Sequence, residues 1–332
     1  MEEEAYVEKF KFRPYDGSRR GRVWRIRNVA WFNMTHQWHR SRILKILVVF
    51  IIFMLILSNL SLFTGIDLLL ETKTANEVLE DHLWGTIRNF VRFQTMIASP
   101  DEVDPVFDTG YSIFMLIGLI MMGAGLVADD QRYKVMEIYD SKIERSEYLI
   151  GKYGALIIFG NILFTLPCIL EWILAVVGIR GVDIIAALPL LLGVIIFTEA
   201  LVLVLTSFIL TFSSLTQKRL YAGLITFGFF LAIANIRSAL VGQPNTFTPL
   251  MYLDFFTVLS VLSFMIQGED TVIYYDTTIT GIDFNLPLDL TGLAGTLVIP
   301  AILFFIVTSL SICSFQLIWG RSRSWRFWKS QI

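Results

Sequence analysis

Long apolar runs alternate with charged segments along the chain. Six of these runs approach the roughly 20 residues that a helix needs to cross a bilayer, and each holds at most two charged residues. The pattern predicts an all-α polytopic membrane protein with six transmembrane helices. The predicted spans lie at about 43–64, 111–128, 153–178, 184–211, 221–240 and 293–319.

Composition supports a membrane protein. Of the 332 residues, 55% are hydrophobic and 17% charged, whereas a soluble domain carries about 25% charged residues. Cys168 and Cys313 lie inside the third and sixth runs, so we expect no disulfide framework or metal cluster. Some forty highly charged residues precede the first run, so a cleavable signal peptide is not expected.

The basic residues indicate which segments face the cytoplasm. Lys and Arg are frequent in 1–42, 129–152 and 321–332, whereas 241–292 contains neither and has six acidic residues. By the positive-inside rule, both termini are expected to be cytoplasmic, with 65–110 and 241–292 extracellular. The chain then divides into a basic N-terminal segment (1–42), a transmembrane domain (43–320) and a basic tail (321–332).

One further run, 247–266, is apolar enough to be a seventh crossing. A seventh crossing would place the bases of the tail outside the cell and the acidic segment 267–292 inside, against the same rule. We therefore expect 247–266 to be an external interfacial or re-entrant helix.

The segment before the first span has the pattern of an amphipathic elbow helix. Trp24, Trp31 and Trp38 are seven residues apart and fall close to one helical face, next to arginines suited to lipid phosphates. We expect this helix to lie along the inner leaflet. His36 and His39 are three residues apart but lack a further ligand nearby, so no metal site is predicted.

A charged helix is predicted between the second and third spans. Val135, Ile138, Tyr139 and Ile143 form a narrow apolar stripe, and acidic and basic residues cover the other faces. Such a helix suits a groove on a partner protein, although a solvated connector fits the pattern equally well. A connector is usually shorter, because helix–helix links take about 2–8 residues.

These features resemble the type-2 permeases of ATP-binding-cassette exporters. The family has an acidic, charged helix after the second span, then an Arg and a Gly-Lys pair opening the third. The elbow helix and the segment "TPLMYLDFF" (248–256) are also similar. Lys134-Val135 replaces a frequent Gly-Thr, and Lys142 stands near a frequent Pro. The corresponding residues here are Asp129, Asp130, Glu137, Arg145, Gly151 and Lys152.

The resemblance implies a coupling helix that sits in a cleft of a separate ATPase subunit. It further implies two such ATPase subunits, which carry ATP and Mg, and a second permease copy or paralogue. Gly151-Lys152 is not a phosphate-binding loop, because Ser146 and Tyr153 stand where Gly and Ser or Thr are required. The residues expected to couple to the ATPase are Arg132, Val135, Glu137, Ile138, Tyr139, Arg145, Gly151 and Lys152.

Polar residues inside the spans are candidates for a translocation path or for helix packing. Buried acids are costly in hydrocarbon, so Glu171 and Glu199 need partners, for which Arg237 and Asn161 are candidates. The apolar spans suit a hydrophobic or lipid-like cargo.

The expected function is therefore transport across the plasma membrane, with no catalytic residue and no nucleic-acid partner. Two alternatives remain: a non-transporting scaffold or sensor, and an intramembrane lipid-modifying enzyme. The second is disfavoured because the spans contain no His and no paired carboxylates on one helix.

Overall fold

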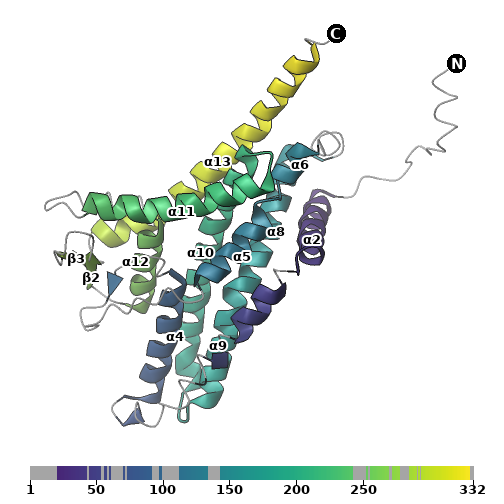
Figure 1. Cartoon of the computed structure of the whole chain (residues 1–332). Coiled ribbons are helices and arrows are strands. Elements are labelled where there is room, and N and C mark those ends of the chain that lie inside the picture. Colours follow the sequence, from purple (N-terminus) through teal and green to yellow (C-terminus); the bar gives the residue numbers. More distant parts are fainter. Residues whose placement is uncertain are drawn as a thin grey trace.

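A computed structural model of the chain is predominantly helical, with one small sheet (Figure 1). The helices form an elongated bundle, and the helix Arg219–Val241 runs across it. The structure describes residues 21–42, 45–53, 56–57, 60, 70–71, 73–91, 97–98, 112–133, 143–241, 252, 255–268, 271–276, 284–289, 291 and 293–329.

Four helical units are long and apolar enough to cross a bilayer: Phe114–Arg132, Arg145–Gly178, Ile184–Leu215 and Gly295–Leu317. They confirm a helical protein suited to a membrane and match the second, third, fourth and sixth predicted spans. The helices concerned are α5 (Ser112–Gly123) with α6 (Ala128–Arg132), α8 (Arg145–Leu163) with α9 (Thr165–Gly178), α10 (Ile184–Leu215) and α13 (Leu293–Lys329).

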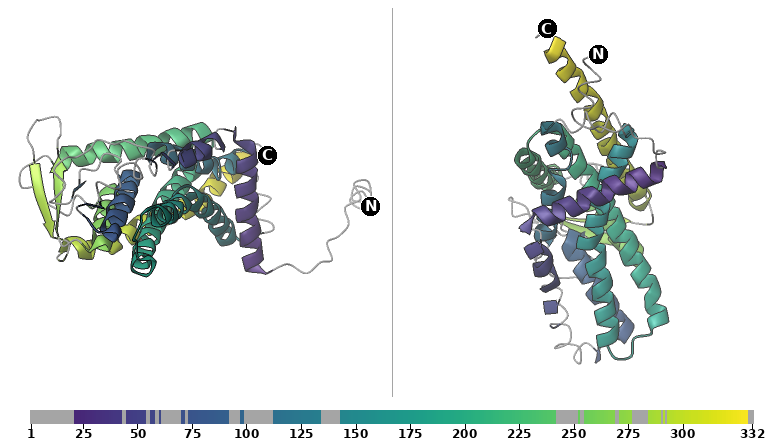
Figure 2. Two further views of the ribbon diagram at one scale, coloured as in Figure 1. Left: turned by 90° about the horizontal axis from the view of Figure 1, so that it is seen from below. Right: turned by 90° about the vertical axis from the view of Figure 1, so that its right-hand side faces the viewer.

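The other two predicted spans are not confirmed. Within 43–64, residues 45–53 are helical, and much of the remainder lies outside the described residues. The predicted span 221–240 corresponds to α11 (Arg219–Val241), which runs across the bundle instead of along α10 (Figures 1 and 2). Small residues permit this crossing, because Ala222 is buried with Ala124 and Ala128 where α11 meets α5 and α6.

A proline explains the break between α8 and α9. Pro167 lacks an N–H, and its ring clashes with the carbonyl four residues earlier, at Leu163, where α8 ends. The two helices nevertheless continue in nearly one line, so the chain crosses the bundle as one unit.

The predicted external segments meet beside the bundle. β1 (Ile97–Ala98), β2 (Thr271–Asp276) and β3 (Phe284–Asp289) form an antiparallel sheet in that order, with Thr271 opposite Asp289 and Asp276 opposite Phe284. Sequence analysis predicted no strands, so this sheet is an addition to the all-α expectation.

The segment 247–266 contributes a buried helix. α12 (Phe255–Gln267) packs against α10, α13 and α4 (Ala75–Val91), and most of its side chains are inaccessible. Its 13 residues span about 20 Å, too short for a hydrocarbon core of about 30 Å. As described, α12 is shorter than a membrane span, and its apolar side chains are enclosed by protein.

Aromatic side chains fill the junction of these helices. The ring of Phe208 on α10 lies 5.1 Å from Phe255 and 5.3 Å from Phe229, while Phe230 lies 5.3 Å from Phe255. Tilted ring pairs at such distances are favourable beyond their burial alone. This cluster joins α10, α11 and α12 into one core.

Candidate functional site

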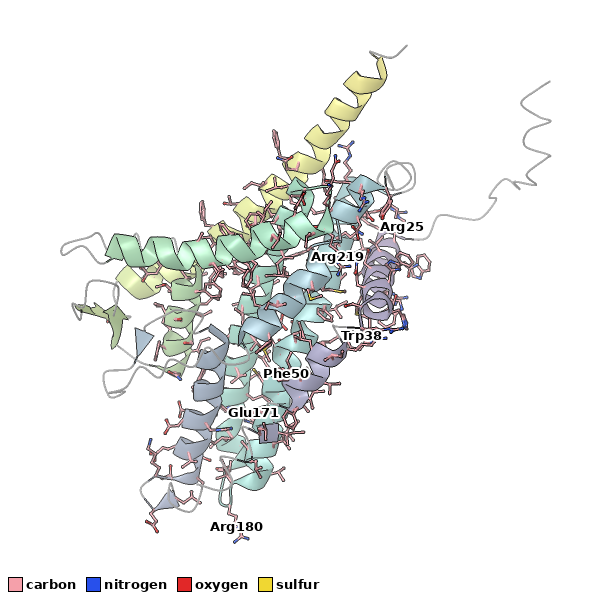
Figure 3. All side chains as sticks on the ribbon, in the orientation of Figure 1. Arg25, Trp38, Phe50, Glu171, Arg180 and Arg219 are labelled. Carbon is pink, nitrogen blue, oxygen red and sulfur yellow. The ribbon has the colours of Figure 1, made fainter. Side chains whose placement is uncertain are left out.

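The candidate site lies at the base of the 129–145 connection, where α6 ends and α8 begins. Helix α2 (Arg22–Arg40) lies beside the start of α8 (Figure 1). Arg25 and Arg219 are found at this end of the bundle, whereas Arg180 marks the opposite end (Figure 3). Charged side chains from α2, α6 and α8 are therefore brought together at one end of the long helices.

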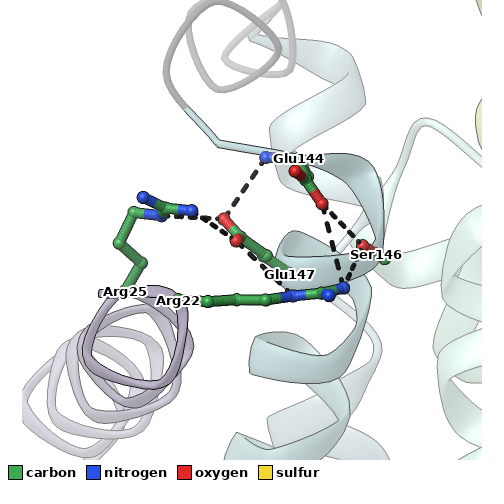
Figure 4. A network of polar contacts seen from close by, with 5 residues as sticks. All are labelled: Arg22, Arg25, Glu144, Ser146 and Glu147. Atoms are coloured by element: carbon green, nitrogen blue, oxygen red, sulfur yellow. Dashed lines mark hydrogen bonds and ion pairs between the residues drawn. The ribbon is translucent and has the colours of Figure 1, made fainter. Parts of the chain in front are cut away.

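Two arginines of α2 contact the first turn of α8 (Figure 4). Arg25 donates from Nε to Glu147 Oε2 at 2.9 Å and from Nη2 to Oε1 at 2.6 Å. Arg22 lies 3.6 Å from Glu147 and donates to Ser146 Oγ at 2.9 Å. The hydrogen bond to Glu147 raises the pKa of Arg25 above its ordinary value. The paired, planar geometry fixes the orientation of α2 as well as its position.

Glu147 has a second role in its own helix. Its carboxylate accepts the backbone N–H of Glu144, and the Glu144 side chain accepts the backbone N–H of Glu147, which completes a capping box. Acidic groups are favoured here, because the first turn of a helix leaves N–H groups unpaired. The same carboxylate thus caps the first turn of α8 and binds Arg25 of α2.

Gly151 lets the two helices touch. A Cβ atom at this position would lie 2.7 Å from Val29 Cγ1 and 3.2 Å from the carbonyl oxygen of Ile26. Such distances are shorter than van der Waals contact, so any side chain would force α2 away. The glycine therefore serves close packing between α2 and α8.

Lys152 is buried, and side chains from two other helices bind its ammonium group. Only 1% of the residue is exposed. Its Nζ lies 2.7 Å from Asp130 Oδ2 and donates to Asn33 Oδ1 at 2.6 Å. The Tyr148 hydroxyl donates to the same Asp130 oxygen at 2.7 Å. A buried cation with this many partners ties α2, α6 and α8 together, since separating them would leave charge without compensation.

Further hydrogen bonds tie α6 to the end of α10. Ser213 Oγ accepts the backbone N–H groups of Val127 and Ala128 at 3.0 and 3.2 Å and donates to the Ala124 carbonyl at 2.9 Å. Gln131 donates to the Ser214 carbonyl at 3.0 Å.

We call the six side chains that join α2, α6 and α8 the polar frame: Arg25, Asn33, Asp130, Glu147, Tyr148 and Lys152.

The predicted coupling residues fall into three groups. Gly151 and Lys152 are buried against α2 and belong to the base of the connection. Arg132 is exposed, and Arg145 lines a hollow of about 310 Å³ together with Ser146, Leu149 and Ser314. Val135, Glu137, Ile138 and Tyr139 lie outside the described residues.

Within the described residues, no hydrogen bond or ion pair joins the predicted intramembrane polar residues to one another. Asn161 on α8 accepts a hydrogen bond from Thr165, the first residue of α9, at 3.4 Å. Glu199 is half-buried on α10. The side chain of Arg237, the expected partner of a buried acid, lies outside the described side chains.

Glu171 instead has a partner that the sequence analysis did not identify. His82 Nε2 on α4 lies 2.8 Å from Glu171 Oε1, and the Glu171 side chain is fully buried. His82 follows Val78 and Leu79 and precedes Leu83, all buried residues of α4. This amphipathic spacing was the available signal, because it turns that face of α4 toward the bundle.

The segment predicted to be an elbow is helical as α2, and its tryptophans are partly enclosed. Trp31 is 60% exposed, whereas Trp38 packs with its ring 6.5 Å from Phe159 of α8. Trp24 is half-buried. His36 stacks on Phe32, and no cluster of three metal-ligating residues occurs in the described part of the chain.

Comparison with known proteins does not identify a family. No protein-family model matches the sequence, and no curated protein matches it.

Proposed function

We propose that the chain is the permease subunit of an ATP-binding-cassette transporter that exports a hydrophobic or lipid-like substrate. Long apolar helices support membrane embedding. The charged 129–152 segment and the resemblance to type-2 permeases support coupling to a separate ATPase. The distribution of Lys and Arg supports a plasma-membrane orientation with both termini cytoplasmic.

The observation that carries the proposal is the contact between the two ends of the 129–145 connection. Asp130 lies at the start of the connection and Lys152 follows its end, and their side chains meet at 2.7 Å in a largely buried site. A force applied to residues 134–142 would therefore move α6 and α8 together. Because Asn33 also binds Lys152, α2 would follow the same movement.

The proposed assembly contains two ATPase subunits that bind ATP and Mg, and two permeases, either identical or paralogous. Glu199 is a candidate for the translocation path. It shares the less buried face of α10 with Leu192 and Ile196, which are 60% and 59% exposed. An acid on that face is expensive in lipid and is better placed beside a polar path between two permeases.

The first experiment is purification of the tagged chain from its native membrane. We expect a stoichiometric ATP-binding-cassette ATPase to accompany it, and ATP hydrolysis to respond to candidate hydrophobic substrates. Absence of any ATPase from the purified complex would contradict the proposal.

A second experiment tests the coupling role of the connection. We expect Glu137→Lys and Arg145→Glu each to reduce transport into liposomes about tenfold, which corresponds to a loss of about 1.4 kcal/mol of coupling, while ATP hydrolysis continues. Lys218→Glu is the control, since Lys218 is an exposed cation just after α10. Unchanged transport in both connection variants would remove the assignment.

A further inference from the structure

The His82–Glu171 pair joins two helices that are far apart in the sequence. His82 belongs to α4 and Glu171 to α9, 89 residues later, and their side chains meet at 2.8 Å. The Glu171 side chain is 0% exposed and that of His82 is 14% exposed. Figure 3 shows Glu171 between these helices in the half of the bundle away from Arg25 and Arg219.

Glu171 is only partly satisfied. Its Oε1 meets His82, whereas its Oε2 is buried and has no hydrogen-bond partner among the described residues. A buried carboxylate with one contact is poorly compensated if it carries a charge. The carboxylate must therefore either face an imidazolium or carry a proton itself.

No other charged group of the described neighbours compensates the pair. Helix α4 packs on α5, α9, α10 and α12, and neither α5 nor α12 contains a charged residue. On α9 the other titratable group is the buried Cys168 thiol. On α10 the acids are Asp183, which caps that helix, and the deeper Glu199. On α4 itself, Glu77, Glu80 and Asp81 are exposed, and the side chain of Arg88 lies outside the described side chains.

Counting protons distinguishes the possible states. The pair has zero net charge when it holds one dissociable proton, either on His82 beside a carboxylate or on Glu171 beside a neutral imidazole. Loss of this proton leaves a net negative charge in the buried site, and a second proton leaves a net positive charge. Either charged state favours separation of the helices, because water then reaches the charge.

We propose that His82 and Glu171 form a one-proton binding site that keeps α4 docked on α9 and releases it when the proton is lost. The apolar contacts of Val78, Leu79 and Leu83 with Trp172 and Ala175 keep α4 nearby in both states. The proton thus sets the balance between two positions of α4.

The test measures the distance between α4 and α9 as the pH changes. Spin labels at Glu80→Cys and Val177→Cys report it by pulsed electron resonance on the full chain in lipid nanodiscs. Both sites are exposed, and Val177 is 81% exposed, whereas the native cysteines are buried. We expect one short distance at pH 6 and a longer population at pH 9. Above the midpoint, the undocked-to-docked ratio should rise about tenfold per pH unit, the slope for one proton.

Two single variants make the test specific. In Glu171→Gln the pair is neutral only when His82 is unprotonated, so docking should improve as the pH rises, opposite to the wild type. In His82→Gln no imidazolium can face Glu171, so the wild-type pH profile should change. The double variant His82→Gln/Glu171→Gln should stay docked from pH 6 to 9.

Asp81→Asn is the matched control, because Asp81 is an exposed carboxylate on the same helix, paired with Lys73. It should leave the wild-type pH profile unchanged. Equal distances at pH 6 and 9 in the wild type would overturn the proposal, as would a Glu171→Gln profile with the wild-type direction. The readout involves neither ATP nor a partner, so its failure would leave the proposed transport function untouched.

Discussion

The polar frame and the His82–Glu171 pair both bury charge between helices, but they do so in different ways. In the frame, Lys152 has Asp130 and Asn33 as partners, and Asp130 also accepts from Tyr148. In the His82–Glu171 pair there is one contact, and Glu171 Oε2 remains unpartnered among the described residues.

The difference shows that helices are held more firmly when each buried charge between them has several hydrogen-bond partners. A network in which each charge has several partners holds its helices in one arrangement over a wide pH range. A pair joined by one contact, whose second carboxylate oxygen has no partner among the described residues, loses fewer interactions when its helices separate. The frame is thus suited to transmit movement, and the α4–α9 contact to respond to conditions.

The largest expected effect comes from breaking the frame at its centre. Lys152→Met should lower the free energy of unfolding by about 3 kcal/mol, because Asp130, which is only 18% exposed, would lose its cation. Thermal unfolding in detergent measures this loss. The double variant Lys152→Met/Asp130→Asn should recover part of it, since no unpaired charge remains.

Lys218→Met is the matched control for this experiment. Lys218 and Lys152 each lie 5.2 Å from a tyrosine ring centre, but Lys218 is exposed. Its loss should change the free energy of unfolding by less than about 0.5 kcal/mol. If Lys152→Met were as mild as Lys218→Met, the frame would not be a stabilising unit.

Hydropathy predicted the long helices well and their ends poorly. The third span was expected to begin at 153, but α8 begins at Arg145. The intervening turns carry Glu147 and Lys152, which a hydropathy pattern treats as solvent-exposed. Their partners, Arg25, Asn33 and Asp130, lie on other helices, and no local pattern reveals that pairing.

The candidate site shows the same limit. The resemblance singled out Gly151 and Lys152, but not their packing against α2, which depends on Val29 and Asn33. His82 was missed because it lies in a moderately polar segment between spans. The crosswise path of α11 was missed as well, since an apolar run of about 20 residues satisfies the length rule whatever its direction.

A smaller effect is expected from filling the contact between α2 and α8. Gly151→Ala should destabilise the protein by about 1–3 kcal/mol, because its Cβ would overlap Val29. Gly154→Ala is the control on the same helix, with its nearest atom, Ala30 Cβ, at 3.8 Å. That change should be neutral or stabilise by up to about 1 kcal/mol through helix propensity. Equal effects of the two changes in thermal unfolding would show that α2 is not closely packed at Gly151.

The smallest effect is expected at the start of α4. It distinguishes a change of α4 at low pH, which belongs to its N-terminal cap, from a change at high pH, which belongs to the His82–Glu171 pair. The Thr74 hydroxyl accepts the Glu77 N–H, and Glu77 accepts the Thr74 N–H at 2.9 Å, which lowers the pKa of Glu77. Thr74→Ala should destabilise this first turn by about 1 kcal/mol, measured by hydrogen exchange of α4.

The pH dependence of this cap has the opposite direction to that of the His82–Glu171 pair. A carboxyl with a lowered pKa stabilises the fold above its unfolded pKa and ceases to do so as the pH falls through the folded value. The protection factors of the first turn of α4, which correct for the intrinsic pH dependence of amide exchange, should therefore fall as the pH drops below the ordinary glutamate range, and the cap itself should not change them between pH 6 and 9. A loss of protection at pH 9 that persists in Thr74→Ala but disappears in His82→Gln/Glu171→Gln would assign the alkaline change to the buried pair. If the change disappeared in Thr74→Ala instead, it would belong to the cap.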